Sequence, residues 1–270
     1  MPDSLAAKAM NTPYTIGGIN TLADDQKQKI YADLIPPELI ERFHVPRSWT
    51  DAYGHPLIHA KWAAGNPSVE FSLFHEFDFP DPVLYGHLTD TINGQVHILL
   101  YILNDPDSPR FDVDKMPDGR PTKFGTRMRN LGAEHAALEA GLAPGQVRRG
   151  LRLLGPAIGS FEKFVQGLGH DTYFIEPLYY HNAVIFERYG FTYQQGRKLM
   201  ERIHAGFSQG GDLLGGLDGS TFRRPTASES IRLRSWAIHD GLLGEPFTNV
   251  TMYKRVGRHS RVSTTQDIAW

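Results

Sequence analysis

The first part of the chain has the spacing of short helices. Thr21 begins a stretch typical of a helix start, which predicts a helix over Gln26–Leu34. Pro37 opens a second short helix, Glu38–Phe43, because a proline in the first turn loses no hydrogen bond. Met1–Asn20 has no such periodicity, and we expect a loose arm there.

From residue 56 the pattern changes to alternating polar and apolar positions, which is typical of strands with one buried face. Asn93-Gly94 is the strongest hairpin signal in the chain. Short connections between successive strands predict an antiparallel meander. The four expected strands are Leu57–Ala63, Val69–His75, Val83–Thr89 and Val96–Leu103.

The second half of the chain is mostly helical in its spacing. Asn104–Arg129 is polar and contains prolines, and is expected to form a long surface loop. Gly190 is placed to end a helix in a left-handed conformation, and the glycine-rich segment Gly206–Gly219 is expected to be flexible. The expected elements are helices over Leu131–Leu142, Gly145–Leu154 and Ile158–Leu168, a strand over His170–Leu178, helices over Asn182–Tyr189 and Gln194–Ala205, and a strand over Asn249–Val256.

Together these elements predict an α+β fold with a central, mostly antiparallel sheet and helices on both faces. One composition shift, near residue 50, separates an N-terminal arm and helical annex (1–50) from the main domain (51–257). Residues 258–270 are expected to form a flexible tail. We find no internal repeat.

Composition limits the classes of function. With 28 Lys and Arg against 30 Asp and Glu, the chain is not built mainly to coat nucleic acid or an anionic membrane. The absence of cysteine excludes disulfides, thiolate metal sites and a cysteine nucleophile. The longest apolar stretch is too short to span a bilayer, and no secretory signal is visible. We therefore expect a cytoplasmic protein with no nucleic-acid or membrane partner.

The strongest candidate for chemistry is the stretch 152–157, which reads Arg-Leu-Leu-Gly-Pro-Ala. Such a loop at a helix start can direct backbone N–H groups and the helix dipole at a pyrophosphate. Arg148, Arg149 and Arg152 would supply positive charge, with Arg127 and Arg129 as further partners. The same residues also fit a helix break at Gly155-Pro156 with solvated arginines, so both interpretations stay open.

Two further segments and the order of elements resemble the N-acetyltransferase (GNAT) superfamily over residues 57–256. The family has N-terminal helices, an antiparallel meander, an Arg/Gln-x-x-Gly-x-Gly/Ala loop that opens a helix, and then a strand. A helix ending in a Tyr-Glu-Lys-x-Gly-Phe segment and a last strand of the Met-x-Lys type follow. The segments similar to these two are Phe186–Phe191 (Phe-Glu-Arg-Tyr-Gly-Phe) and Thr251–Val256 (Thr-Met-Tyr-Lys-Arg-Val).

The resemblance implies that acetyl-CoA or another acyl-CoA is the co-substrate and that a small-molecule or peptide amine is the acceptor. The resemblance is also compatible with a homodimer. The family's asparagine falls at Tyr179, with Asn182 three residues later, and residues 131–154 look helical where the family has a strand. The residues implied to bind the acyl-CoA are Arg149, Arg152, Gly155, Ala157 and Asn182.

The implied mechanism needs a base that takes a proton from the attacking amine. His75 and Glu76, at the end of a predicted strand, are the candidate bases, although His75 also fits a hydrogen-bonded surface residue. The family's tyrosine acid falls at Phe186, and Tyr189 or Tyr180 would have to take its place. Without an acid, the chain would be a non-catalytic binding protein of the same shape.

A serine esterase is a competing hypothesis. Residues 206–210 read Gly-Phe-Ser-Gln-Gly, the pattern that places a nucleophile, here Ser208, on a strand-to-helix turn in α/β-hydrolases. Asp218 or Asp240 with His239 or His259 could complete a triad. However, the residues before Ser208 look helical, so a glycine-rich lid or linker is the alternative.

A metal site is a third hypothesis. His55 and His59, with His75, Glu76, Asp78 or Asp81, would provide nitrogen and oxygen ligands. The alternating pattern and Pro56 favour a strand there, where the two imidazoles of a His-x-x-x-His pair do not converge as they do on a helix. His181, beside Asn182 at a strand-to-helix junction, fits either a functional residue or the neighbour of a helix cap.

Overall fold

The computed structural model describes residues 13–122, 128–265 and 268–270 and has an α+β fold. Its seven strands form a mixed, mostly antiparallel open sheet with the order β1-β2-β3-β4-β5-β7-β6. The strands are β1 (Ile58–Lys61), β2 (Ser68–Leu73), β3 (Leu84–Asp90), β4 (Val96–Leu103), β5 (Thr172–Ile175), β6 (Thr192–Gln195) and β7 (Thr251–Arg255).

Nine α-helices and two 3-10 helices lie within the described residues. They are α2 (Ile16–Ile19), α3 (Asp24–Tyr31), η1 (Ala32–Leu34), α4 (Pro37–Arg42), α5 (Leu131–Glu139), α6 (Leu154–Gly167), α7 (Tyr180–Arg188), α8 (Arg197–Gly206), α9 (Asp212–Gly215), η2 (Pro225–Glu229) and α10 (Ile231–His239).

The chain divides into two compact units. The first unit contains the chain up to Asn104, Gly150–Glu176 and Lys254–Arg258. The second unit contains Asp105–Arg149, Pro177–Tyr253 and His259–Trp270. These divisions differ from the single boundary near residue 50 that the composition suggests.

In the first unit, β1 to β4 form the expected antiparallel meander. Val69, Phe71 and Leu73 alternate along β2 as buried residues, while the positions between them are half-buried. Phe71 lies opposite Gly86 of β3, where an added Cβ would come 2.5 Å from the Phe71 ring. Glycine at 86 therefore makes room for this ring in the core.

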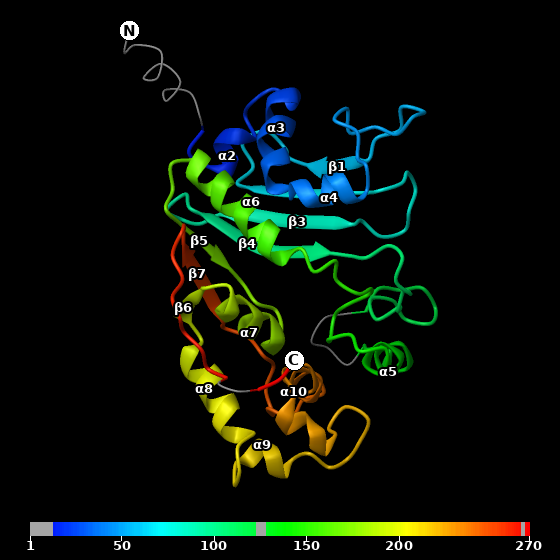
Figure 1. Ribbon diagram of the computed structural model, residues 1–270, viewed down its shortest axis with the longest axis vertical. Coiled ribbons are helices and arrows are strands. Elements are labelled where there is room, and N and C mark those ends of the chain that lie inside the picture. The colour runs from blue at the N-terminus through cyan, green and yellow to red at the C-terminus, as the bar shows by residue number, and fades with distance from the viewer. Residues whose placement is uncertain (1–12, 123–127, 266–267) are drawn as a thin grey trace. The chain divides into compact units, whose positions relative to one another are not determined.

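Helices of the first unit cover one face of this meander: α2, α3, α4 and α6 lie over the same side of β1–β4 (Figure 1). Tyr101 of β4 packs edge-on against Phe161 of α6 at 4.7 Å and donates a hydrogen bond to the Leu34 carbonyl of η1. Tyr31 of α3 and Phe164 of α6 are stacked at 6.1 Å. The helices and the buried side of the sheet thus share one aromatic core.

The second unit has a core of its own around the fully buried Trp236 of α10. The indole N–H of Trp236 donates to the Leu142 carbonyl at 2.8 Å, and Phe222 stacks on the ring at 5.3 Å. Buried apolar residues from α5 and the segments around it complete this core: Val113, Ala137, Leu138 and Leu142.

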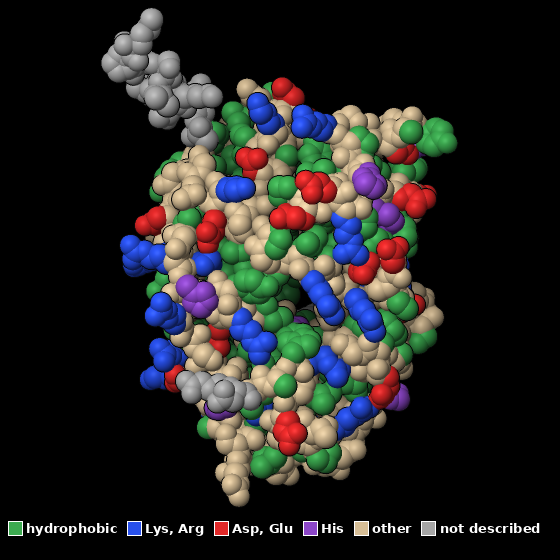
Figure 2. Space-filling model, viewed as in Figure 1, with side chains coloured by type: hydrophobic (Ala, Val, Ile, Leu, Met, Phe, Trp, Pro, Cys, Tyr) green, Lys and Arg blue, Asp and Glu red, His purple; other side chains and the backbone are tan. Residues whose placement is uncertain are grey.

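On the face of the molecule drawn in Figure 2, Lys and Arg side chains (blue) are interspersed with Asp and Glu side chains (red). This mixture agrees with the nearly balanced charge of the sequence.

Several segments differ from the sequence-based expectations. Gly145–Leu154 was expected to be helical, but Gly145 has a positive φ of 81°, and the carbonyls of Val147 and Arg149 accept hydrogen bonds from a distant segment. Gln194 and Gln195, expected to begin a helix, instead end the strand β6. A helix break at Gly155-Pro156 was also wrong, because α6 runs through both residues from Leu154.

The C-terminal segment, expected to be a flexible tail, makes specific contacts within the second unit. Ser260 bonds to the carbonyls of Gly190 and Phe191, and the backbone N–H and hydroxyl of Thr264 both donate to Glu187. The close approach of the C-terminal segment to the end of α7 depends on Gly190. This glycine ends α7 with a φ of 86°, as expected.

We expect Gly190→Ala to destabilise the second unit by about 2–4 kcal/mol, from left-handed strain and from overpacking. A Cβ at Gly190 would lie 2.9 Å from the His259 Cα. The matched control is Gly210→Ala, since Gly210 has a similar φ of 79° but no atom within 4 Å of its added Cβ. Urea unfolding should show a loss of only about 1 kcal/mol for the control. Equal losses for the two variants would contradict the close packing at Gly190.

Candidate functional site

The parallel strands β4 and β5 of the first unit pair over only a short length. His97 and Ile98 of β4 lie opposite Phe174 and Ile175 of β5, and the Glu176 N–H donates to the Ile98 carbonyl at 3.2 Å. Beyond Ile98, β4 continues to Leu103, and its residues there are all half-buried rather than alternately buried. Their pairing thus ends at Ile98 and Ile175, where β5 itself ends and β4 runs on.

A β-bulge lies at the point where the pairing of β4 with β5 ends. Ile98 pairs with Leu88 of β3, but Leu100 pairs with His87, so Leu99 is an extra residue on β4. A bulge bends its strand and redirects the side chains and backbone groups that follow. The bulge and the end of the β4–β5 pairing therefore occur together in the first unit.

The chain comes back to the end of β4 just before α6. The Leu151 N–H donates to the Leu103 carbonyl at 3.3 Å, and α6 begins three residues later at Leu154. Its N-cap, Leu153, makes no side-chain capping bond, and the first helical bond runs from the Ala157 N–H to the Leu153 carbonyl.

The first turn of α6 leaves donors for an anion. The N–H groups of Leu154 and Gly155 make no hydrogen bond to any described residue, and Pro156 has no N–H. Unpaired N–H groups and the positive end of the helix dipole together attract phosphate groups.

The residues of the expected phosphate loop occupy distinct positions at this helix start. Arg152 is exposed and has a positive φ of 60°, which is unusual for a residue other than glycine. Gly155 is half-buried in the first turn, and Ala157 is fully buried. These three belong to the first unit and lie close together in the chain at the start of α6.

The other residues implied to bind acyl-CoA belong to the second unit. The Arg149 guanidinium donates to the Ala140 carbonyl at the end of α5, at 3.2 Å. The side-chain amide of Asn182 lies 3.2 Å from His181 Nε2. Arg127, a further expected partner, lies outside the described residues. Arg149 and Asn182 therefore each have a partner within their own unit.

The candidate bases His75 and Glu76 lie in the turn after β2, in the first unit. The His75 ring is half-buried between two aromatic rings, edge-on to Phe79 at 4.4 Å and tilted against Phe43 at 5.6 Å. Glu76 is exposed. Which of the two accepts a proton stays a prediction.

Three aromatic residues in or next to α7 are relevant to the choice of the acid catalyst: Tyr180, Phe186 and Tyr189. Tyr189 is the C-cap of α7 and is 38% exposed, whereas Tyr180 is fully buried, and burial raises its pKa. Phe186 packs against Phe191 at 5.3 Å. Tyr189 is thus the more accessible of the two candidate tyrosines.

Ser208 does not lie on a strand-to-helix turn. It follows α8, and its hydroxyl donates to the His204 carbonyl at 3.0 Å. The expectation that the preceding residues are helical is confirmed. The strand that the nucleophile turn of an α/β-hydrolase requires is therefore not present before Ser208.

The proposed metal ligands do not gather. His55 pairs with Asp51 at 2.8 Å and stacks on Phe77 at 4.2 Å. In the described ranges, no three His, Asp or Glu side chains are grouped so as to hold a metal ion. Nor does this part of the chain include a helix with the length and apolar character needed to cross a membrane.

The second unit contains an ionic cluster that sequence reasoning missed. Glu134, 5% exposed, accepts hydrogen bonds from Arg129 and lies 3.1 Å from His239 Nε2. Asp240 accepts from Arg129 and from Arg223, each at 2.9 Å. Burial alone would raise the pKa of Glu134, but His239 and Arg129 outweigh burial and lower it. We call these five residues the buried ionic cluster.

A buried histidine lies beside this cluster. His181 Nδ1 is 2.8 Å from the Ser235 hydroxyl, and the Tyr179 ring stacks on the imidazole at 5.5 Å. Burial, with a smaller effect from the charge of His239, lowers the pKa of His181 to about 3. His181 is therefore neutral at physiological pH and acts as a hydrogen-bonding residue of the interior.

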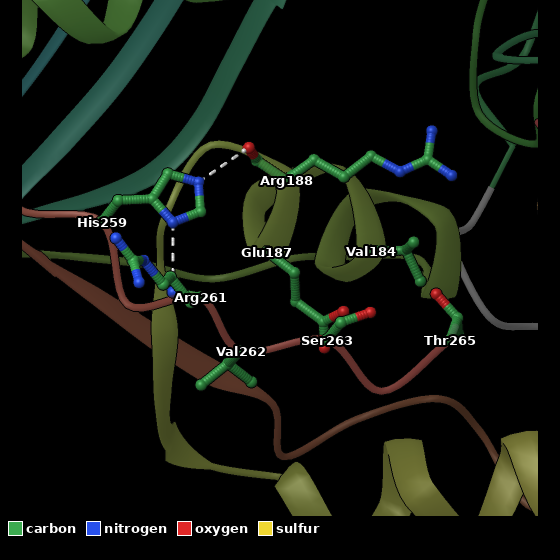
Figure 3. Close-up of a pocket in the computed structure, with 8 residues that line it drawn as sticks. All are labelled: Val184, Glu187, Arg188, His259, Arg261, Val262, Ser263 and Thr265. Atoms are coloured by element: carbon green, nitrogen blue, oxygen red, sulfur yellow. Dashed lines mark hydrogen bonds between the residues drawn. The ribbon is translucent and has the colours of Figure 1, made fainter. Parts of the chain in front are cut away.

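A pocket of about 230 Å³ lies between α7 and the C-terminal segment of the second unit (Figure 3). Glu187 reaches from α7 toward Ser263, while Arg188 and Arg261 extend to opposite sides. Glu187 already accepts three hydrogen bonds, from the Tyr193 hydroxyl and from Thr264. The contacts therefore anchor the segment, and the guanidiniums do not converge on a ligand.

Comparison of the chain with protein families, with curated protein sequences and with solved structures gives no match.

Proposed function

We propose that the protein is an acyl-CoA-dependent N-acyltransferase of the GNAT type that acts on a small-molecule or peptide amine. The observation that carries the proposal is the geometry of the first unit, where β4 runs on beyond its pairing with β5 and α6 begins with two N–H groups that no described residue accepts. An uncapped helix start beside a strand edge without a partner from β5 suits a ligand with an extended arm and a pyrophosphate.

Strand order also supports the proposal. An antiparallel meander precedes α6, β5 runs parallel to β4, and the last strand, β7, is hydrogen-bonded between β5 and β6. The segments that resemble the family, Phe186–Phe191 and Thr251–Val256, contain the end of α7 and β7. We also propose that helices cover both faces of the sheet.

In the proposed reaction, the nitrogen of the amine attacks the carbonyl carbon of the thioester, and a base takes a proton from that nitrogen. The carbon–sulfur bond breaks, and the departing thiolate takes up a proton. His75 or Glu76 would serve as the base, whereas a tyrosine acid at Tyr189 stays an expectation of the resemblance, because Tyr189 belongs to the second unit. The phosphates would bind at Arg152, Gly155 and the buried Ala157, whose small side chain lets the first turn of α6 pack closely.

Acetyl-CoA should stabilise the protein against heat. A ligand at about 100 times its Kd adds roughly 2.7 kcal/mol, which corresponds to a rise in Tm of about 5–10 °C for a chain of this size. Arg152→Glu should abolish most of this rise, because it reverses the charge beside the free N–H groups of α6. The control, Arg47→Glu, changes an exposed arginine elsewhere in the first unit. If 1 mM acetyl-CoA leaves Tm unchanged, the proposed function fails.

The packing of Phe186 against Phe191 at the family's tyrosine position favours a second candidate, a binding protein of the same shape without catalysis. Release of free coenzyme A distinguishes the two functions. Under the proposed function, acetyl-CoA and a panel of primary amines release thiol. A protein that binds acetyl-CoA but releases no thiol with any amine of the panel would be the second candidate.

A further inference from the structure

A second pocket lies in the first unit, beside the edge strand β1, and no residue of the proposed acyltransferase site lines it. Its volume is about 300 Å³, at the lower end of the range of small-molecule pockets. Ile58, Ala60 and Trp62 recur at every second residue along and just after β1, so they face the pocket from the same side of the sheet.

The Trp62 indole is held in place from within the fold. Tyr31 stacks on it at 5.7 Å with an angle of 14° between the rings, and the Tyr31 hydroxyl donates to the fully buried Asn20 at 2.8 Å. The ammonium of Lys27 lies 5.6 Å from the centre of the indole. Trp62, which lines the pocket, therefore loses little side-chain freedom when a ligand binds.

A second indole, that of Trp49, also lines the pocket and is held by a strained backbone. Trp49 has a φ of 57°, a left-handed conformation that is a genuine outlier for a bulky side chain. Two hydrogen bonds fix it there: the Trp49 N–H donates to the Pro46 carbonyl at 2.9 Å, and its carbonyl accepts from the Leu57 N–H at 2.8 Å. Strain of this kind persists where the surroundings fix it, and it is concentrated at ligand sites.

The polar groups of the pocket are neutral. Ser48 and Thr50 contribute hydroxyls and Gln28 of α3 an amide, and none of the eight described lining residues is Asp, Glu, Lys or Arg. The Thr50 hydroxyl donates to the Ser48 hydroxyl at 2.9 Å, which leaves the Ser48 proton able to donate to a ligand. Hydroxyls and amides both donate and accept, so they suit a ligand that carries several hydroxyl groups.

We propose that this pocket, lined by Trp49, Trp62, Gln28, Ser48 and Thr50, binds a neutral polyhydroxylated ring, that is, a sugar. The negative face of an indole attracts the positively polarised C–H groups of such a ring, and the hydroxyls and the amide bind its hydroxyls. A charged ligand would lose its hydration without an opposite charge among the lining side chains. The proposal does not depend on acyl transfer.

The test is calorimetric titration of the full chain with methyl β-glucopyranoside, methyl β-galactopyranoside and N-acetylglucosamine. We expect at least one of them to bind with a Kd on the order of 1 mM. Trp62→Ala should weaken that binding roughly tenfold through loss of the stacking face, and Ser48→Ala severalfold through loss of one hydrogen bond. Because Ser48 is exposed, Ser48→Ala keeps the test valid if Trp62→Ala fails to fold. Trp270→Ala, which removes an exposed indole outside the pocket, should leave the Kd unchanged.

Three results would overturn the proposal. No heat from any of the three sugars at 50 mM would show that the pocket does not bind them. The same Kd in Ser48→Ala as in the unchanged protein would place the bound sugar elsewhere. Binding of adenosine, but of none of the sugars, would identify the pocket as a site for planar aromatic rings instead.

Discussion

Replacing Glu134 by glutamine is expected to destabilise the second unit by about 3 kcal/mol, because the change leaves the half-buried Arg129 without its main partner. The Glu134 carboxylate binds Arg129 through both oxygens and also contacts His239, and it is almost completely buried. Asp240 still pairs with Arg129 in the variant. The loss of stability is therefore smaller than it would be if Arg129 had no partner at all. Urea unfolding at pH 7 measures the effect.

The chain provides a matched control on the same helix. Glu139 of α5 is also paired with an arginine, Arg224, but its side chain is 52% exposed. Glu139→Gln should cost less than about 1 kcal/mol, since exposed ion pairs contribute little. In addition, the double variant Glu134→Leu with Arg129→Met should recover much of the stability that Glu134→Gln loses, because it removes both charges. Equal costs for Glu134→Gln and Glu139→Gln would show that the buried ionic cluster is unimportant for folding.

The meander could be predicted because its physical cause is local. Side chains alternate between a buried and a half-buried face, so the sequence shows period two, and β4 has the expected bounds, Val96–Leu103. The turn before β4 contains Gly94 with a positive φ of 75°, as a tight hairpin requires. By contrast, β6 is four residues long, with two half-buried residues followed by two exposed ones, so it carries no such alternation.

Segments whose structure depends on distant partners could not be predicted. The backbone of Val147 and Arg149 pairs with residues near Phe111 and Asp105, and this pairing prevents the helix that the apolar spacing suggests. The sequence predicts a start of this helix at Ile158, a few residues after the observed start at Leu154, because Gly155-Pro156 is typical of a break. In the structure Pro156 lies in the first turn of α6, where a proline loses no hydrogen bond.

The same limit applies to the candidate sites. The Arg-x-x-Gly-x-Ala stretch is contiguous, and its position at a helix start could be inferred from residue types alone. The buried ionic cluster joins Glu134 to His239, which lie 105 residues apart, and no pattern within a short window links them. The sugar pocket likewise combines Gln28 with Trp49 and Trp62 from separate elements.

The buried, neutral His181 is expected to make the protein sensitive to mild acid. Its pKa in the folded state is about 3, below the value of about 6.5 in an unfolded chain, so the unfolded state binds a proton first as the pH falls. Stability is therefore lost between pH 6.5 and about 3, at roughly 1.4 kcal/mol per pH unit, and the loss from pH 7.5 to 4.5 is about 2.7 kcal/mol. The lowered pKa of Glu134 acts in a different window, because its contribution is lost only below about pH 4.3.

The free energy of unfolding at pH 7.5, 6.5, 5.5 and 4.5, measured in urea, tests this expectation. His181→Gln should lose baseline stability but should have a shallower pH dependence than the unchanged protein, by about 2.7 kcal/mol over this range. Burial also lowers the pKa values of His97 and His204, so part of the slope remains in the variant, and the difference between the two slopes isolates His181. His135→Gln is the control, since His135 on α5 has a side chain that is 54% exposed, and it should leave the slope unchanged. If His181→Gln keeps the full slope, His181 takes up its proton as readily in the folded state as in the unfolded one, and its burial has no consequence for acid stability.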